Sequence, residues 1–135
     1  EELQRFDILA RMAADMMARQ QTEAALRESE ERFRTLADGA PALIWVNDLE
    51  GCQFVNRGYL KFLGVGIPDV RGYDWAHFVH PHDREQYVEA YRDAMKHEKI
   101  FDEEFRFRRH DGEYRWMHSV GQPRFTGDGT FTGYT

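Results

Sequence analysis

Several features are scarce in this chain of 135 residues, and each absence excludes a class of protein. A single cysteine, Cys52, means that no disulfide can form within the chain. No apolar run approaches the roughly 20 residues that span a bilayer, and no signal peptide opens the chain. The net charge of −6 argues against a nucleic-acid-binding surface, which needs basic side chains to neutralise phosphates. We therefore expect a cytoplasmic protein that makes no contact with nucleic acid or membrane through these residues.

Glycine and proline are also absent from the first 38 residues, where strong helix formers predominate. This composition predicts one helix over residues 1–37, about 55 Å long at the α-helical rise per residue. We expect the helix to end near Gly39 and Pro41, because glycine favours helix C-caps and proline cannot continue a helix.

Apolar side chains recur along this helix in a heptad pattern that is broken between Arg19 and Glu23. The pattern favours a two-stranded coiled coil, and hence a homodimer joined through the helix. The alternative is a helix that folds back on its own domain. The side chains expected in the coiled-coil seam are Leu9, Met12, Met16, Leu26 and Phe33.

Residues 38–135 alternate quickly between short predicted elements. Asn56 is typical of a helix N-cap and Gly64 of a helix end, and a longer helix is expected from His82 or Asp83 to about Glu98. The order of elements predicts an α+β fold in which helices cover one face of a five-stranded antiparallel sheet. The strands are expected near residues 42–48, 52–56, 101–109, 114–125 and 130–135.

Three phrases in this second part resemble PAS domains of bacterial sensor histidine kinases and diguanylate cyclases. The most distinctive is the hairpin phrase at residues 105–116, and the others lie at residues 40–48 and 79–84. His82 departs from the family pattern, which has an aspartate there. Residues 30–36 also resemble the phrase that leads into such domains, so the likeness covers about residues 28–135.

The resemblance implies a PAS-like sensory or relay module that is not an enzyme by itself. It implies a signalling helix at residues 1–37 and a PAS domain at residues 38–135, whose final strand is cut short. In this family such a module passes a ligand-dependent or conformational change through flanking helices to an effector. We therefore expect an effector domain, such as a kinase of a two-component system, in the same polypeptide.

The resemblance also implies a ligand pocket between the sheet and the helices. Alternation along the strands places side chains such as Leu43, Trp45 and Asn47 on one face. The large aromatic residues either surround a small organic ligand or fill the space and leave a dry core. The candidate pocket residues are Leu43, Trp45, Asn47, Tyr59, Phe62, Trp75, Phe78, Tyr91, Phe105, Phe107, Met117 and Ser119.

The hairpin around Asp111 and Gly112 has two alternative registers. A two-residue turn pairs Phe107 with Trp116 and directs both rings into the pocket. A loop one residue longer turns Trp116 outward, beside Arg106 and Arg108, and places Met117 opposite Phe107. The resemblance favours the longer loop.

A cluster of histidines supplies a hypothesis from another class. His77, His80, His82 and Asp83 have the side chains that bind zinc, which would suggest a small metal-dependent hydrolase. Because Pro81 fixes a turn into the long helix, capping of that helix is the simpler interpretation. We predict no metal site.

Two cofactors known from the resembling family are not expected either. In blue-light flavin receptors the reactive cysteine lies on a helix that faces the flavin, whereas Cys52 falls on the second predicted strand. Haem-binding members use a histidine on the long helix, but His97, at the end of that helix, more simply complements the helix dipole. A ligand-free dimerisation domain is the third hypothesis.

Overall fold

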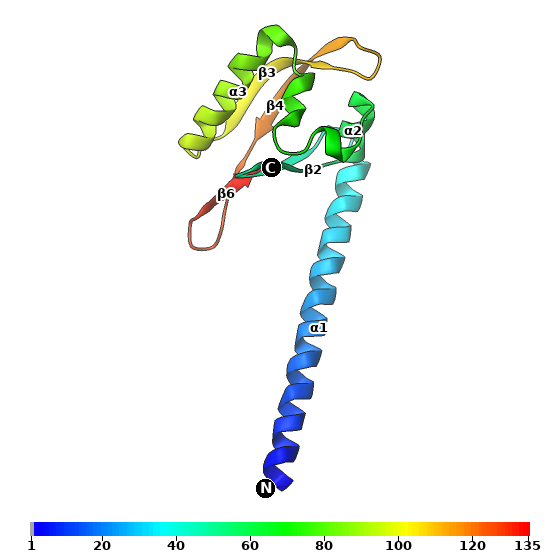
Figure 1. Ribbon diagram of the computed structural model, residues 1–135, viewed down its shortest axis with the longest axis vertical. Helices are drawn as coiled ribbons and strands as arrows, with labels where there is room; N and C mark the ends of the chain where they lie inside the picture. Colours follow the sequence, from blue (N-terminus) through cyan, green and yellow to red (C-terminus); the bar gives the residue numbers. More distant parts are fainter. Residues whose placement is uncertain (1) are drawn as a thin grey trace. The chain divides into compact units, whose positions relative to one another are not determined.

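A computed structural model describes the backbone of residues 2–135 and the side chains of residues 7–135. The chain divides between Gly39 and Ala40 into two compact units (Figure 1). The first is α1 (Glu2–Gly39). The second contains β1 (Trp45–Asp48), β2 (Gly51–Val55), α2 (Arg57–Leu63), η1 (Ile67–Asp69), η2 (Asp74–Phe78), α3 (Pro81–Lys96), β3 (Phe101–Arg108), β4 (Tyr114–Gly121), β5 (Pro123–Phe125) and β6 (Phe131–Tyr134).

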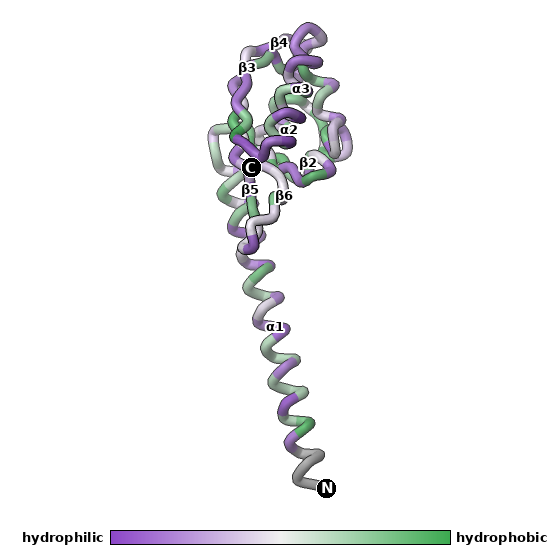
Figure 2. The backbone as a smooth tube through the Cα atoms, turned by 90° about the vertical axis from the view of Figure 1, so that its left-hand side faces the viewer, coloured by the Kyte–Doolittle hydropathy of each residue, from purple (hydrophilic) through white to green (hydrophobic). Residues whose placement is uncertain are grey.

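The helix expected at the start of the chain is confirmed, and it ends at Gly39 as predicted. Hydrophobic and hydrophilic residues alternate along it (Figure 2). Its large apolar side chains between Ile8 and Leu36 are exposed, including all five of the expected seam. The coiled coil stays a prediction. Among the residues described, no helix is long and apolar enough to cross a membrane.

Within residues 2–135 the strands pair only in antiparallel fashion, as predicted, but they number six where five were expected. One set has the order β2-β1-β6-β5, and β3 pairs with β4. The predicted fourth strand, residues 114–125, is divided at Gln122. There the chain changes partner from β3 to β6, and Gln122 exchanges two backbone hydrogen bonds with Thr135, at 2.8 and 3.0 Å. Pro123 follows at once, and it has no N–H to continue the ladder.

Asn56 connects the segment before β1 to α2, which it caps as predicted. Its Oδ1 accepts hydrogen bonds from the backbone N–H groups of Ile44 and Tyr59, both at 3.0 Å. Its Nδ2 donates to the carbonyl of Ala42 at 2.8 Å. Since this side chain is completely buried, these bonds hold both segments in place at the edge of the core.

The long helix starts earlier than expected. His80 is the N-cap, since its Nδ1 accepts the backbone N–H of His82 at 3.1 Å, and Pro81 is the first helical residue. The expected start at His82 or Asp83 is therefore wrong. Proline suits the first position because the N–H it lacks would have had no partner within the helix. Asp83 instead holds Arg106 on β3, accepting its Nε and Nη2 at 2.8 Å each and its backbone N–H at 3.0 Å.

The β3–β4 hairpin has the longer loop, and Trp116 points outward, as predicted. Its side chain is 68% exposed, and the guanidinium carbon of Arg106 lies 5.2 Å from its ring centroid. The expected partner of Phe107 was wrong. Phe107 lies opposite Arg115, and Met117 lies opposite Phe105. The two registers differ by two residues, which leaves every side chain on its expected face because strand side chains alternate with a period of two.

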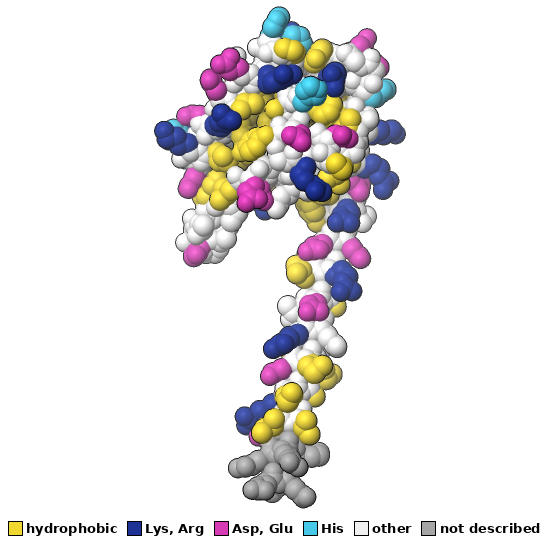
Figure 3. Space-filling model, viewed as in Figure 1, with side chains coloured by type: hydrophobic (Ala, Val, Ile, Leu, Met, Phe, Trp, Pro, Cys, Tyr) yellow, Lys and Arg dark blue, Asp and Glu magenta, His cyan; other side chains and the backbone are white. Residues whose placement is uncertain are grey.

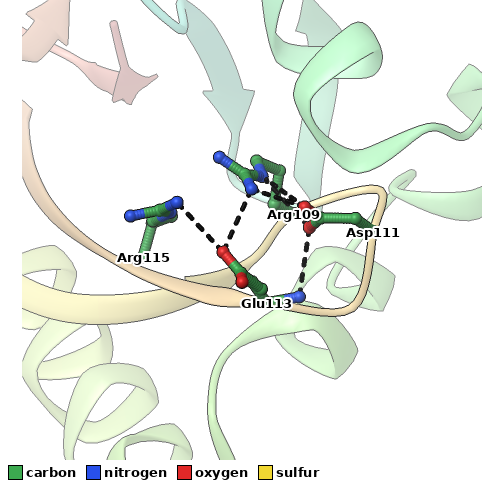
Figure 4. Close-up of polar contacts among 4 residues, drawn as sticks. All are labelled: Arg109, Asp111, Glu113 and Arg115. Atoms are coloured by element: carbon green, nitrogen blue, oxygen red, sulfur yellow. Dashed lines mark hydrogen bonds and ion pairs between the residues drawn. The ribbon is translucent and has the colours of Figure 1, made fainter.

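Alternating charges close the loop of this hairpin (Figure 4). The backbone N–H of Arg109 donates to the carbonyl of Glu113 at 2.7 Å. The guanidinium of Arg109 binds the carboxylates of Asp111 and Glu113, and Arg115 reaches Glu113 at 3.0 Å. The hydrogen bond from Arg109 holds the pKa of Asp111 well below its ordinary value. Asp111 Oδ1 also accepts the backbone N–H of Glu113 at 3.1 Å, which fixes the turn.

Candidate functional site

A cavity of about 270 Å³ lies between the inner face of the strands and the helical segments of the second unit. Figure 3 shows hydrophobic side chains gathered at the centre of one face of this unit. All of the predicted pocket residues except Phe62 and Phe78 line the cavity. The lining consists of Leu43, Trp45, Asn47, Cys52, Tyr59, Trp75, Tyr87, Tyr91, Phe105, Phe107, Met117, His118, Ser119 and Val120.

The two predicted residues outside the lining lie behind it or beside it. Phe62 stacks on Phe107, with ring centroids 6.0 Å apart and nearly parallel planes, so it supports the wall from behind. Phe78 is buried, and the guanidinium carbon of Arg108 lies 5.1 Å from the centroid of the Phe78 ring. The sequence predicted that both lie near the helical face of the sheet. It carries no information on which aromatic rings line the cavity and which lie behind them.

Sequence reasoning also missed Cys52, Tyr87, His118 and Val120 as lining residues. Tyr87 had a usable signal, since it precedes Tyr91, a predicted pocket residue, by four positions and so lies on the same face of α3. For His118 and Val120, the alternation of side chains along the strand gives no signal of a lining role. Both side chains point to the exposed face, so another part of each residue must reach the cavity.

Buried aromatic rings fix the shape of the cavity. Tyr91 is central, and Trp45, Trp75 and Phe101 lie edge-on to it with ring centroids 5.5–6.5 Å away. Tyr134 of β6 packs on another side at 5.6 Å. Such edge-to-face pairs add directional stabilisation to the burial of each ring. The walls of the cavity are therefore held by mutual ring contacts.

Polar side chains interrupt these apolar walls. Asn47, 3% exposed, donates through Nδ2 to the Tyr91 hydroxyl at 3.0 Å, and Trp45 Nε1 donates to Ser119 Oγ at 3.2 Å. Within the described residues, Asn47 Oδ1 and Trp75 Nε1 are buried and make no hydrogen bond. Both atoms are almost completely inaccessible, so neither is offered to a molecule in the cavity.

The cavity is electrically neutral. Burial raises the pKa of the Cys52 thiol to about 11 and that of Tyr91 to about 12, and it holds the pKa values of Tyr59 and Tyr87 well above the ordinary value. All four groups therefore keep their protons at neutral pH. In the described part of the chain, no Asp, Glu, Lys or Arg belongs to the lining.

The backbone of β4 explains why His118 and Val120 reach the cavity. Gln122 directs both its N–H and its C=O toward Thr135. In an extended strand, residues two and four positions earlier direct their backbone N–H and C=O groups toward the same edge of the strand. The backbone groups of Val120 and His118 therefore face away from β3, and β4 has no other partner in the named sheets along this stretch.

The facing edge belongs to β1. The C=O of Ile44 accepts the backbone N–H of Asn56, so the backbone groups of Leu43 and Trp45 point away from β2. β4 and the β1–β2 pair diverge from the position of the C-terminus (Figure 1). Residues of both edges line the cavity, which is partly open to solvent.

The histidine cluster gives the zinc hydrolase hypothesis no support. His80 uses Nδ1 as the cap of α3, and the Asp83 carboxylate is occupied by Arg106. Across the residues described, no group of three or more His, Cys, Asp or Glu side chains has the arrangement to hold a metal ion.

Comparison with known proteins places the fold. A family model described as the PAS fold matches residues 53–135. An uncharacterised protein of Sinorhizobium fredii is 38% identical over 111 residues, which is 82% of this chain and 13% of that protein. A peroxide stress-activated histidine kinase of Schizosaccharomyces pombe is 27% identical over 71% of this chain and 6% of its own length. This chain thus matches only a small part of these relatives.

Solved structures show the same architecture. The PAS domain of a protein from Colwellia psychrerythraea superposes with a TM-score of 0.63 at 20% identity, covering 77% of this chain and 89% of that one. A sensory box histidine kinase/response regulator from Burkholderia thailandensis superposes with a TM-score of 0.54 at 25% identity, covering 76% and 81%. Each likeness covers about three quarters of this chain.

Proposed function

This chain belongs to the PAS fold family, and we propose that its aromatic cavity receives the signal that the module transmits. As a PAS domain it is a sensory domain of signal transduction and not itself catalytic. One observation carries the proposal: a cavity of about 270 Å³ in the core has mainly aromatic walls with a few polar side chains, Asn47 and Ser119 among them. Such convergence of apolar walls with a few polar groups is typical of small-molecule sites.

The module is proposed to work inside a longer, cytoplasmic signalling protein. It resembles 4–6% of the length of two histidine kinases from Schizosaccharomyces pombe. These similarities support a histidine kinase effector in the same polypeptide. The exposed apolar side chains of α1 support a homodimer joined through that helix, since they would otherwise remain in water.

The unpaired edges of β1 and β4 suggest how occupancy would be transmitted. A strand that continued beyond Thr135 in the direction of β6 would enter between β1 and β4, antiparallel to both. It would find the free backbone groups of Trp45 and Val120 on its two sides. A ligand in the cavity would then contact this strand directly and shift the packing of whatever follows it.

The test is a thermal-unfolding screen of a small-molecule library against the 135-residue chain. Ser119→Leu and Met117→Trp fill the cavity, and Trp116→Leu changes the opposite face of the same strand as a control. We expect some compounds to raise the Tm of the unsubstituted chain and of the control but not of the filled variants. Equal shifts in the filled variants would place binding elsewhere. No shift with any compound would favour the ligand-free dimerisation domain.

A further inference from the structure

We propose that His80 makes the start of α3 sensitive to pH: its neutral imidazole caps the helix, and protonation of the ring removes the cap. This device acts on the fold whether or not the cavity holds a molecule, so it goes beyond the proposed function and does not depend on it. Its parts are the first turn of α3 and the residues of β3 and β4 that surround the His80 ring.

The cap depends on a ring nitrogen that carries no proton. His80 Nδ1 accepts the backbone N–H of His82 at 3.1 Å. The N–H groups in the first turn of a helix have no acceptor within the helix, so a capping side chain supplies one. Serine, aspartate and asparagine cap through an oxygen, which still accepts at mildly acidic pH. An imidazolium carries a proton on both nitrogens and can only donate, so a protonated His80 turns a donor toward the donor of His82.

The surroundings of the His80 ring disfavour its protonated form. Partial burial lowers the pKa of His80 from its ordinary value of 6.5, and the charges of Arg106 and His82 lower this pKa further. The two imidazole rings lie 4.9 Å apart, and the carbonyl of Arg106 accepts the backbone N–H of His80 at 2.9 Å. The ring also lies at the N-terminal end of α3, where the helix dipole disfavours a positive charge.

Asp83 is the carboxylate that acts in the opposite direction, and both its oxygens are already engaged. Its charge raises the pKa of His80. However, Oδ2 accepts the Nε and the backbone N–H of Arg106, and Oδ1 accepts Nη2 of the same guanidinium. The arginine therefore offsets much of the negative charge that would otherwise stabilise an imidazolium at His80.

The remaining neighbours of the ring supply no negative charge. The ring of Tyr114 on β4 lies 4.5 Å from the His80 ring, and Arg108 lies opposite Tyr114 in the hairpin. Arg84, in the first turn of α3, donates from its guanidinium to the carbonyl of His77 at 3.1 Å. Both arginines add positive charge to this end of the helix, which again favours the neutral ring.

The capped end belongs to the helix that forms part of the cavity wall. Tyr87 and Tyr91 of α3 are buried and line the cavity. The same end is joined to β3, through the backbone of His80 and the side chain of Asp83. We therefore expect acidification to loosen the N-terminal turn of this helix while the buried rings hold its later turns.

The direction of the pKa shift sets the pH window. Because the pKa of His80 is lowered in the folded state, the cap contributes its full stabilisation above about pH 6.5 and loses it as the pH falls through the folded-state value. Asp83 stays ionised in this window, since its pKa is about 2. The hydrogen bond to Asp102 raises the pKa of His118, so the contribution of His118 has the opposite sign and is lost as the pH rises. A comparison with variants at His80 removes these other contributions.

The test compares the 135-residue chain with His80→Asn and His80→Ala in urea unfolding from pH 8 to pH 5. The side-chain oxygen of asparagine accepts the same N–H throughout this range, whereas alanine has no acceptor. We expect the unsubstituted chain to keep a constant difference from His80→Asn above pH 7 and to lose stability relative to it below pH 6.5. At pH 5 it should approach His80→Ala. The loss of an N-cap typically changes the unfolding equilibrium constant by about fivefold.

Nuclear magnetic resonance assigns the effect to the cap. The titration of the His80 ring protons should give a pKa below the ordinary value of 6.5. The protection of the His82 amide against hydrogen exchange, corrected for the intrinsic rate at each pH, should fall as His80 becomes protonated. In His80→Asn the same protection factor should stay constant.

Three results would overturn the proposal. The first is a His80 pKa at or above its ordinary value. The second is a stability difference from His80→Asn that stays the same from pH 8 to pH 5. The third is a difference that changes with pH while the protection of the His82 amide does not, because the titration would then act through the charge of the ring and not through the cap.

Discussion

The two faces of the β3–β4 hairpin are made by alternate residues of the same strands, yet they are stabilised by different forces. On the inner face, Phe105 and Phe107 are buried, and Ser119 bonds to Trp45 inside the cavity wall. On the outer face, Trp116 is exposed and Arg106 lies over its ring. The buried part of the inner face is held by the packing of neutral side chains, and the outer face is held by contacts of charged side chains.

The contrast shows what a one-residue change of register would do. It would bring the arginines to the neutral cavity and the phenylalanines to water. The inner face should contribute most of what the hairpin adds to the free energy of unfolding, because burial and hydrogen bonding act there without competition from solvent. The predictions below, ordered from the largest expected effect to the smallest, measure that difference.

The largest loss is expected for Phe107→Ala on the inner face. The ring is 2% exposed and contacts the rings of Tyr59, Phe62 and Phe105. Truncation of such a ring leaves a void, so the free energy of unfolding should fall by about 3–5 kcal/mol. Urea unfolding followed by circular dichroism measures it. A loss no larger than that of an outer-face substitution would remove the contrast between the faces.

Ser119→Ala should have the next largest effect. It leaves Trp45 Nε1 without its acceptor in a partly buried position, which costs about 1–3 kcal/mol. Ser119→Thr keeps the hydroxyl and is the control. The same urea experiment compares the two variants. If both lose the same amount, the side chain matters for its volume and the hydrogen bond to Trp45 contributes nothing measurable.

Much of this arrangement was predictable from residue patterns. Alternation in β1 and β3 placed Trp45, Asn47 and Phe107 on the cavity side, and Gly39 marked the end of α1. Alternation reports side chains only, so it could not predict the lining role of His118. The stacking order that puts Phe62 behind Phe107 depends on how α2 packs on the sheet, and no local pattern encodes that distance.

Boundaries were the less predictable part of the fold. The division at Gln122 depends on a change of strand partner, which is a property of the tertiary fold and not of residues 114–125 alone. The start of α3 at Pro81 did have a signal, since proline favours the first helical turn. His80 was overlooked because a histidine cap uses a ring nitrogen where serine or aspartate would use an oxygen.

Asp83→Asn tests the main ion pair of the outer face, and a smaller effect is expected because both partners are partly exposed. The hydrogen bond from Arg106 lowers the pKa of Asp83 from 3.8 to about 2. A lowered folded-state pKa gives a stabilisation that is present above pH 4 and is lost as the pH falls through about 2. The difference in urea midpoint between the unsubstituted chain and the variant should therefore shrink between pH 4 and pH 2. A constant difference would show that the charge of Asp83 contributes nothing.

The smallest effect is expected for Trp116→Ala. In the chain alone this ring is 68% exposed, and substitutions at exposed positions usually change the free energy of unfolding by less than about 0.5 kcal/mol. Urea unfolding at low protein concentration should therefore barely separate the variant from the unsubstituted chain. A loss as large as that of Ser119→Ala would mean that another surface covers Trp116 in solution.

Repeating the measurement over a hundredfold range of protein concentration then decides between two surfaces. A loss that grows with concentration indicates a second copy of the chain, because association stabilises the folded state by mass action. A loss independent of concentration indicates contact with another segment of the same chain.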